Sequence, residues 1–322
     1  MIVRLRELKA RLGPALADRL RLGVPLAPLT ALQVGGPAEA YLQVSTEAEL
    51  VQAVSVAQTI ETLWYLLAGG SNLCISDRGI RGLVVHNRAA DLDLGEVTRV
   101  ATGHGLMQLF LKSAAVSLSG LQFAVGIPGA VGGALISNAG AYRQSIGPLV
   151  EALRIVRNGQ VSRVPASWME FAYRDSRLRR SRDEGVCVTS VALRLTPGRR
   201  DAILAEAREY QQNRIHRQPW SPSAGSFFKN VYDRSLAERV RGLPEDLRAV
   251  GVVPAGYLSA ECGCKGLRRG GAEVSQMHAN FIVNRGGATA TDVRLVAEEI
   301  KRRARERFGV ELDEEVIYAG DW

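Results

Sequence analysis

Residues 126–142 read GIPGAVGGALISNAGAY, and this stretch decides how the rest of the chain is interpreted. It holds five glycines and one proline within a run of thirty residues, 113–142, that carries no charged side chain. Such a segment is used where backbone approaches backbone or a ligand more closely than side chains allow. Close packing of two core elements and a bed for a flat or diphosphate-bearing ligand both fit the composition.

The overall composition is that of a globular protein with room for two or three domains. The chain has 322 residues, of which 46% are hydrophobic and 23% charged. Its net charge of +8 suits nucleic acid or small polyanions such as nucleotide pyrophosphates. The cationic residues are spread along the chain and are not interleaved with aromatics, so nucleic acid is not expected as a partner. Arginine outnumbers lysine heavily, so a lysine inside a motif deserves notice.

The chain is expected to be cytoplasmic, without a membrane span. The uncharged run is the candidate for a span, but Pro128 and the glycine density argue against one. The opening residues, MIVRLRELKARLG, are charged and amphipathic, unlike a signal peptide. Four cysteines suggest no disulfide framework in a chain of this size. Cys262-Gly263-Cys264 and His278 lack a full zinc ligand set, so reduced structural thiols and no metal site are expected.

The order of apolar segments predicts alternating strands and helices. Strands are expected at 40–44, 63–67 and 82–86, with a helix at 48–58 capped by Thr46. Asn158-Gly159 separates two further strands and predicts a hairpin with a type I′ turn. The other expected elements are strands at 99–102, 151–157, 160–164 and 185–195, helices at 106–117, 201–217 and 291–308 (the last capped by Thr291), and a strand or extended tail at 310–320.

Two glycine segments could hold a ligand through the backbone. Residues 68–77, AGGSNLCISD, follow a strand with consecutive glycines that expose N–H groups. They match neither a Walker loop nor a Rossmann pattern, so phosphate binding and a tight turn are equally compatible. In the second segment, Gly129, Gly132 and Gly133 could bring main chain against a ligand, while Asn138 and Tyr142 supply side-chain hydrogen bonds.

Two other segments offer a cation and a hydroxyl. Arg174, in the sequence YRDS, has the neighbours of a carboxylate clamp, although a surface ion pair is the commoner use of such an arginine. Ser226 lies in SAGSFFKN, which has neither a local histidine nor a G-x-S-x-G pattern. A proton donor or hydrogen-bonding serine is therefore favoured over a covalent nucleophile. Lys229, in this lysine-poor chain, strengthens the case for a site.

The C-terminal third holds the remaining candidates. Residues 263–284 contain Lys265 and His278 as possible ligand contacts, although a lone histidine is more often structural. The acidic tail ELDEE, residues 311–315, precedes two apolar residues. Strand alternation could aim one of its carboxylates inward.

Taken in this order, the segments resemble the UDP-N-acetylenolpyruvoylglucosamine reductase family, the MurB flavoproteins of peptidoglycan synthesis. The likeness runs from about residue 26 to 320, and AGGSN, GIPGAVGG, YRDS, GSFFKN, HANFIVN and GVELDEEV are specific in combination. The resemblance implies an α/β (α+β) fold. A two-subdomain FAD-binding region of the vanillyl-alcohol-oxidase/PCMH type is joined to a smaller α/β substrate domain. The implied ranges are 1–85 with the tail 310–322, 86–200, and 201–309.

The resemblance also implies the reaction. An FAD-dependent oxidoreductase would hold FAD non-covalently and consume NADPH to reduce UDP-N-acetylglucosamine enolpyruvate to UDP-N-acetylmuramate. Hydride would pass from flavin N5 to C3 of the enolpyruvyl group, in a pathway that serves cell-wall biogenesis, cell shape and division. A monomer or weak dimer is expected. Another FAD-dependent oxidase or dehydrogenase of the same flavin fold is the alternative enzyme, and a non-catalytic nucleotide-binding module is a third, weaker alternative.

Site residues follow from the family's motifs. Arg174 and Glu315 would stabilise the charge that develops on the substrate carboxylate, and Ser226 would protonate C2. The implied substrate-binding residues are Arg217, Asn230, Lys265 and His278. The implied cofactor-binding residues are Gly69, Gly70, Ser71, Asn72, Gly126, Ile127, Pro128, Gly129, Ala130, Gly132, Gly133, Asn138, Ala139, Gly140, Ala141 and Tyr142.

The chain also departs from the family's usual pattern. Arg143 stands where glycine is common and leaves the local turn geometry open. The short connection from 201 to 223 resembles the subtype without a tyrosine-bearing loop.

Overall fold

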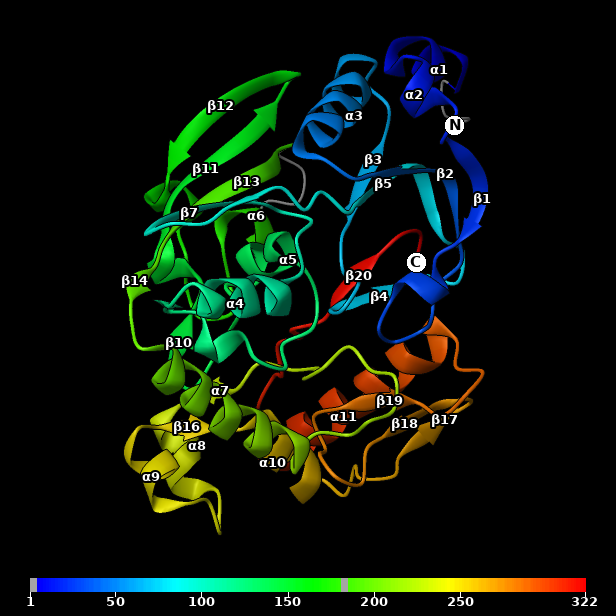
Figure 1. The fold of residues 1–322 in the computed structure, drawn as a ribbon. Helices are drawn as coiled ribbons and strands as arrows, with labels where there is room; N and C mark the ends of the chain where they lie inside the picture. The colour runs from blue at the N-terminus through cyan, green and yellow to red at the C-terminus, as the bar shows by residue number, and fades with distance from the viewer. Residues whose placement is uncertain (1–4, 181–184) are drawn as a thin grey trace. The chain divides into compact units, whose positions relative to one another are not determined.

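The computed structural model describes residues 5–180 and 185–322, so the first four residues of the amphipathic opening segment lie outside it (Figure 1). The chain forms two compact units. Unit 1 comprises Met1–Pro25, Pro37–Gly70 and Ile80–His216. Unit 2 comprises Leu26–Gly36, Ser71–Gly79 and Arg217–Trp322. These boundaries differ from those of the three predicted domains, and the three-domain division remains a prediction.

The first sheet of unit 1 carries the predicted strand–helix–strand pattern. Strands β2, β5 and β3 run parallel, and β1 adds to β2 in the antiparallel sense. Helix α3 (Glu47–Thr59) begins after Thr46, whose side chain accepts the Glu49 N–H at 3.2 Å, as predicted. Its buried residues, among them Leu50 and Val54, join the apolar core of this sheet. The elements here are α1 (Leu5–Leu12), α2 (Pro14–Ala17), β1 (Arg21–Pro25), β2 (Pro37–Val44), β3 (Trp64–Leu67) and β5 (Ile80–Asn87).

The second sheet of unit 1 is antiparallel throughout, in the order β12-β11-β13-β7-β6. Figure 1 labels its first four strands. Asn158 (φ 50°) and Gly159 (φ 73°) form the two-residue turn of the β11–β12 hairpin, which confirms the predicted left-handed turn. Phe110 and Phe123 fill the core beside this sheet. The strands are β6 (Leu92–Asp93), β7 (Val97–Ala101), β11 (Val150–Arg157), β12 (Gln160–Pro165) and β13 (Cys187–Arg194).

The other elements of unit 1 position its loops. They are α4 (Leu106–Ala115), β8 (Leu118–Ser119), η2 (Gln122–Ala124), α5 (Val131–Ile136), β9 (Gly140–Ala141), β10 (Gln144–Ser145), η3 (Gly147–Leu149), η4 (Ala166–Met169), α6 (Arg177–Arg180), β14 (Thr196–Pro197) and α7 (Arg200–Ile215). Helix α7 packs against η2 and α4, so the long polar helix expected at 201–217 belongs to unit 1.

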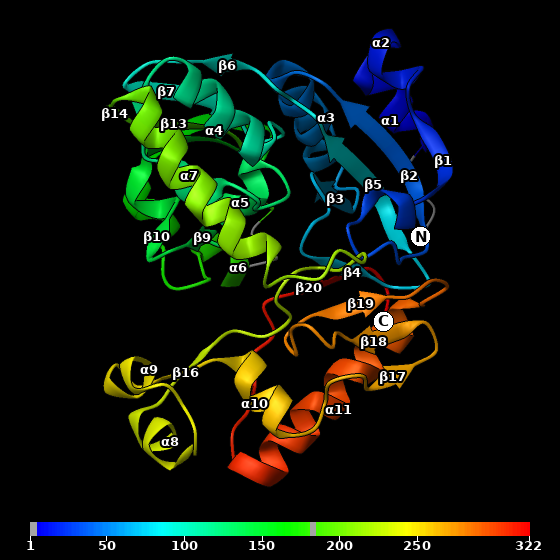
Figure 2. The ribbon, with the colours of Figure 1, turned by 60° about the horizontal axis from the view of Figure 1, so that its bottom comes forward.

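Unit 2 is built around helix α11 (Ala290–Phe308), which lies along a three-stranded sheet (Figure 2). The helix matches the predicted one, but its N-cap is Thr289, in a capping box with Asp292, and not Thr291. The prediction was wrong because the Thr291 hydroxyl donates to Asp77, at 2.7 Å. Asp77 also accepts the backbone N–H groups of Ala290 and Thr291, so a segment distant in sequence helps to start the helix.

The tail runs parallel to a strand from the first part of the chain. Strand β20 (Ile317–Ala319) pairs with β4 (Leu73–Ile75), which confirms an extended tail. The other elements of unit 2 are η1 (Ala27–Leu29), β15 (Val231–Tyr232), α8 (Arg234–Arg239), α9 (Glu245–Ala249), β16 (Val252–Val253), α10 (Ala255–Glu261), β17 (Arg268–Arg269), β18 (Ala272–Val274) and β19 (Ile282–Asn284). Within 5–180 and 185–322, no helix is long and apolar enough to cross a membrane.

Candidate active site

Gly69 of the first glycine segment and Gly129 of the second, both in unit 1, lie backbone to backbone. A Cβ added to Gly69 would stand 2.5 Å from the Cα atom of Gly129 and 3.0 Å from the nitrogen of Ala130. The first distance is shorter than real Cβ contacts allow and the second is unusually tight, so a side chain at residue 69 would force the segments apart. The structure therefore brings together two motifs that the sequence separates by about sixty residues.

The start of helix α5, in the second segment, is fixed by one neighbouring loop. The N–H of Val131 donates to the His104 carbonyl at 2.9 Å, and that of Gly132 donates to the Thr102 carbonyl at 2.8 Å. A Cβ on Gly132 would lie 3.1 Å from Thr102, whereas one on Gly133 would meet nothing within 4 Å. One glycine of this pair thus allows close packing and the other leaves open space beside the backbone. Such a side-chain-free surface fits a flat or diphosphate-bearing group such as FAD.

His86 supports the first glycine segment, and sequence reasoning did not find it. Its imidazole is buried at the end of β5, where Nδ1 lies 2.6 Å from the Tyr41 hydroxyl and the ring hydrogen-bonds with the backbone of Ala68. Burial, together with Arg88, lowers the pKa of His86 to about 4, so the ring is neutral at physiological pH. The signal was a histidine inside an apolar strand, which usually indicates only a structural role.

Asn138 holds a turn within the second segment. Its side-chain Nδ2 donates to the Ala172 carbonyl at 2.8 Å, and its Oδ1 accepts the Gly147 N–H at 3.0 Å. The side chain is buried and the residue has φ 42°. Asn138 therefore braces the loop around residues 138–147, whatever contact its backbone makes with a cofactor.

Tyr142 and Arg143 form the turn whose geometry the sequence left open. They connect β9 to β10 with φ values of 55° and 62°, so the hairpin forms although neither residue is glycine. The Tyr142 ring stacks on Tyr210 of α7 with centroids 3.8 Å apart, and its hydroxyl donates to the Tyr210 carbonyl at 2.8 Å. This helix was not expected to contact the segment, and Tyr210 is a second residue that sequence reasoning missed.

Arg174 is directed at the backbone of the same segment. Its Nη2 donates to the Gly140 carbonyl at 2.5 Å and its Nη1 to the Asn138 carbonyl at 3.5 Å. Arg174 occupies a left-handed position (φ 51°) in a tight turn closed by reciprocal bonds between Ala172 and Asp175. The half-buried guanidinium is thus held in place by the turn and by the carbonyl groups it contacts.

Ser226 and Glu315 are carried on paired segments of unit 2. The Glu315 N–H donates to the carbonyl of Phe227, the residue after Ser226, at 2.8 Å. Phe228 and Glu314 form an antiparallel bridge, so the serine segment and the tail have a fixed register. Both predicted catalytic residues are half-buried, whereas Phe227 and Phe228 are buried in the core. The predicted Ser226–Glu315 combination is therefore assembled within one unit.

Asn72 links the tail to the first glycine segment. Its Nδ2 donates to the Glu315 carbonyl at 2.9 Å, and its own carbonyl accepts the Ile317 N–H at 3.0 Å. The predicted cofactor set 69–72 is thus divided between the units: Gly69 and Gly70 belong to unit 1, Ser71 and Asn72 to unit 2. In this structure the side chain of Asn72 holds the position of Glu315.

The predicted substrate-binding residues of unit 2 differ in exposure. Arg217 and Lys265 are exposed, while Asn230 and His278 are half-buried. Asn230 Oδ1 accepts the N–H of Ala255 at the start of α10 (3.3 Å). Burial, with a contribution from Lys265, lowers the pKa of His278 below its usual value. His278 therefore offers a neutral imidazole near pH 7, not a third cation.

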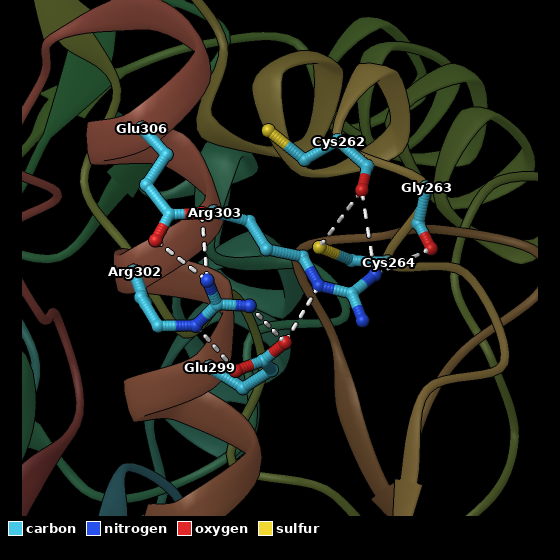
Figure 3. A network of polar contacts seen from close by, with 7 residues as sticks. All are labelled: Cys262, Gly263, Cys264, Glu299, Arg302, Arg303 and Glu306. Atoms are coloured by element: carbon cyan, nitrogen blue, oxygen red, sulfur yellow. Dashed lines mark hydrogen bonds and ion pairs between the residues drawn. The ribbon is translucent and has the colours of Figure 1, made fainter.

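Helix α10 is fixed at its other end by α11 (Figure 3). Arg303 Nη1 donates to the carbonyls of Gly263 (3.1 Å) and Cys262 (3.4 Å), and its Nε donates to Glu299 at 2.8 Å. The thiols of Cys262 and Cys264 have raised pKa values, mainly through burial, and for Cys264 the value is about 11. Both thiols therefore stay protonated at neutral pH. They lie at the contact between α10 and α11. No cluster with metal-ligand composition occurs in the described part of the chain.

Known families match both parts of the chain. Residues 38–163 match a family described as an FAD binding domain. Residues 217–319 match one described as UDP-N-acetylenolpyruvoylglucosamine reductase, C-terminal domain. The two matches place a flavin-binding sequence over most of both sheets of unit 1 and a reductase domain over the C-terminal part of unit 2.

Full-length relatives show the same similarity. A UDP-N-acetylenolpyruvoylglucosamine reductase of Synechococcus sp. is 36% identical over 95% of this chain and 93% of its own length. That of Solibacter usitatus is 38% identical, over 92% and 95% respectively. The crystal structure of the enzyme from Thermus caldophilus matches with a TM-score of 0.73 and 32% identity, covering 93% of this chain and 98% of that one.

Proposed function

The chain belongs to the UDP-N-acetylenolpyruvoylglucosamine reductase family, and we propose that Arg174, Ser226 and Glu315 carry its chemistry. The protein is an FAD-dependent oxidoreductase of peptidoglycan precursor synthesis, with NADPH as the reductant and UDP-N-acetylglucosamine enolpyruvate as the substrate. FAD, when bound, supplies the hydride that reduces the enolpyruvyl group, and the product is UDP-N-acetylmuramate. The observation that supports pairing Ser226 with Glu315 is the bond from the Glu315 N–H to the carbonyl of Phe227, the residue after Ser226.

We assign the cofactor contacts to the backbone of residues 69–72 and 126–133 and to residues 138–142. The fit rests on Gly133, whose missing side chain leaves open space, and on Gly69 and Gly129, whose backbones touch. A planar ring or a diphosphate can approach N–H groups closely where no Cβ intervenes. Asn138 and Arg174 hold this backbone in place through the bonds described above.

The chemistry requires an acid and a charge-stabilising pair. When hydride adds to the unsaturated carboxylate, negative charge builds on the carboxylate and C2 becomes strongly basic. The Arg174 guanidinium is suited to the carboxylate charge, and the Ser226 hydroxyl is suited to give its proton to C2. Serine is a weak acid, so this transfer is reasonable only because the acceptor is so strong a base. Glu315 would assist as a hydrogen-bond donor in its protonated form.

The UDP portion of the substrate requires cations and hydrogen-bond donors. Exposed Arg217 and Lys265 are suited to the diphosphate. Asn230 and the neutral His278 are suited to hydrogen bonds with uncharged groups of the nucleotide or sugar. We therefore assign this part of the substrate to unit 2.

The test is NADPH oxidation by the purified holoenzyme. We expect a yellow protein that oxidises NADPH only when UDP-N-acetylglucosamine enolpyruvate is added. A preparation that oxidises NADPH equally well with a small alcohol or sugar would instead favour a different flavin-dependent dehydrogenase. Glu315→Gln tests the tail: flavin reoxidation by substrate should slow at least about tenfold, with flavin reduction by NADPH preserved. Reoxidation at the wild-type rate would exclude Glu315 from the reaction.

A further inference from the structure

Asn280 has a buried side-chain amide that forms hydrogen bonds with the backbone next to Ser226. It is only 3% exposed and precedes β19, inside the apolar run ANFIV. Its Oδ1 accepts the Phe228 N–H at 2.9 Å, and its Nδ2 donates to the Phe228 carbonyl at 2.9 Å. One side chain thus satisfies both backbone groups of one residue, as a neighbouring strand would.

A third bond extends this clamp to the residue beside the serine. The Phe227 N–H donates to the Asn280 carbonyl at 2.7 Å. On the other side, the Phe227 carbonyl accepts the Glu315 N–H at 2.8 Å, and the Lys229 N–H donates to the Asp313 backbone carbonyl at 2.8 Å. Residues 227–229 therefore lie between Asn280 and the acidic tail, with hydrogen bonds on both sides.

The bonds from Asn280 matter because hydrogen bonds, from Asn280 on one side and from the tail on the other, fix the peptide planes next to Ser226. Gly225 precedes the serine with φ 79°, and a Cβ there would meet nothing within 4 Å. The buried rings of Phe227 and Phe228 anchor their side chains, but they leave the rotation of the peptide groups to hydrogen bonding. A change of peptide orientation at 227 would redirect both the Ser226 hydroxyl and the Glu315 backbone.

We propose that Asn280 is a positioning residue for the reaction. It orients Ser226 through its bonds to the backbone of Phe227 and Phe228, and it orients Glu315 through the Phe227 carbonyl. The inference rests on the proposed role of Ser226. Asn280 makes no contact with reacting atoms in this assignment. Asn280 contributes by keeping the Ser226 hydroxyl aligned for proton transfer. A displacement of a catalytic group by about 1 Å can reduce a rate by about a hundredfold.

The test uses Asn280→Asp in the holoenzyme. Aspartate keeps the shape and the Oδ1 acceptor but replaces the Nδ2 donor with an oxygen facing the Phe228 carbonyl. We expect reoxidation of the reduced flavin by UDP-N-acetylglucosamine enolpyruvate to slow about ten- to a hundredfold. Flavin reduction by NADPH should stay within about twofold of wild type, because that half-reaction needs no proton from Ser226.

A matched control comes from the end of β19, the strand that follows Asn280. Asn284 is also buried, and its Nδ2 donates to the Leu32 carbonyl at 3.1 Å, with no bond to residues 226–228. Asn284→Asp should lower the thermal midpoint as Asn280→Asp does, because each places a carboxylate against a buried carbonyl. It should leave the reoxidation rate unchanged.

A double-mutant cycle separates positioning from general stability. If Asn280 acts through Ser226, then the double variant Ser226→Ala, Asn280→Asp should reoxidise its flavin less than about twofold more slowly than Ser226→Ala alone. The positioning role would be overturned if Asn280→Asp slowed reoxidation in the Ser226→Ala background as much as it does alone. It would also be overturned if Asn280→Asp alone slowed flavin reduction and flavin reoxidation equally. A wild-type reoxidation rate in Asn280→Asp when Ser226→Ala is slow would overturn it as well. A fast Ser226→Ala enzyme would instead overturn the proposed function itself. Asn280→Ala, judged by the same criteria, serves if the aspartate variant does not fold.

Discussion

Residues 126–133 of unit 1 and residues 226–229 of unit 2 both rely on unusual backbone, but they are stabilised in different ways. In the first, backbone packs on backbone: Gly69 approaches Gly129, and Gly132 approaches Thr102, because Gly69 and Gly132 lack side chains. In the second, the buried side chain of Asn280 holds the backbone and the tail supplies the opposite partner. A region of the first kind is sensitive to added atoms, and one of the second kind to lost hydrogen bonds. The variants below test this difference.

The largest effect is expected from Ser226→Ala. Removal of the proposed proton donor should slow flavin reoxidation by substrate about 10²- to 10⁴-fold. Flavin reduction by NADPH should be nearly unchanged, and the fold should be intact because Ser226 is only half-buried. Stopped-flow absorbance of the flavin band measures both half-reactions. An equal loss in the two would show that Ser226 acts in cofactor binding and not in proton transfer.

Gly69→Ala and Gly133→Ala form the next pair. The added methyl at residue 69 would meet Gly129 at 2.5 Å, so we expect a loss of about 1–3 kcal/mol in the free energy of unfolding and weaker FAD retention. At residue 133 the methyl meets nothing within 4 Å, and helix α5 should be unchanged or slightly stabilised. FAD affinity should nevertheless fall. Urea unfolding of apoprotein and flavin titration measure the two quantities, and wild-type FAD affinity in Gly133→Ala would contradict the assigned cofactor bed.

A smaller, pH-dependent effect is expected from Asp77→Asn in unit 2. Burial opposes ionisation of Asp77, but its hydrogen bonds with Thr291 and Ala290 outweigh burial and lower its pKa. The charged form is therefore favoured in the folded state, so its stabilisation is present above about pH 4 and lost as pH falls through the lowered pKa. At pH 7 the free energy of unfolding of the variant should be about 1 kcal/mol lower than that of wild type, as for loss of a helix cap.

Urea midpoints of wild type and Asp77→Asn between pH 3 and 7 test this dependence. The difference between the two proteins should shrink toward the acid end of the range. A constant difference would mean that the carboxylate charge makes no contribution.

The smallest effect is a gain, from Arg143→Gly. Arg143 has φ 62° in a two-residue turn, a conformation that glycine adopts without strain. We expect about 1 kcal/mol of stabilisation, measured by the thermal midpoint of the apoprotein. The hairpin turn at Asn158-Gly159 provides the reverse comparison: Gly159→Arg should cost at least a similar amount, because its Cβ would also lie 3.2 Å from the Thr59 hydroxyl. A destabilised Arg143→Gly protein would show that the arginine side chain makes contacts that outweigh the backbone strain.

Local patterns predicted much of the fold because they depend on neighbouring residues. Thr46 capped α3 as expected, and Asn158-Gly159 made the predicted turn. The cap of α11 was predicted two residues too late because Thr291 is engaged by Asp77, more than two hundred residues earlier in the chain. The stacking of Tyr142 on Tyr210 could not be predicted for the same reason, since nothing local indicates that α7 packs there.

The sequence by itself determined the family, the α/β class and the segments to which we assign the chemistry. Glycine density and turn dipeptides reflect local conformational preferences, and motif order is a property of the linear chain. All three can therefore be recognised in the sequence. Only the tertiary structure decided which backbone Gly69 approaches, which carbonyls Arg174 contacts and which amide bonds the backbone beside Ser226. These depend on groups far apart in sequence, and a buried Asn280 must find its hydrogen-bond partners wherever the folded chain places them.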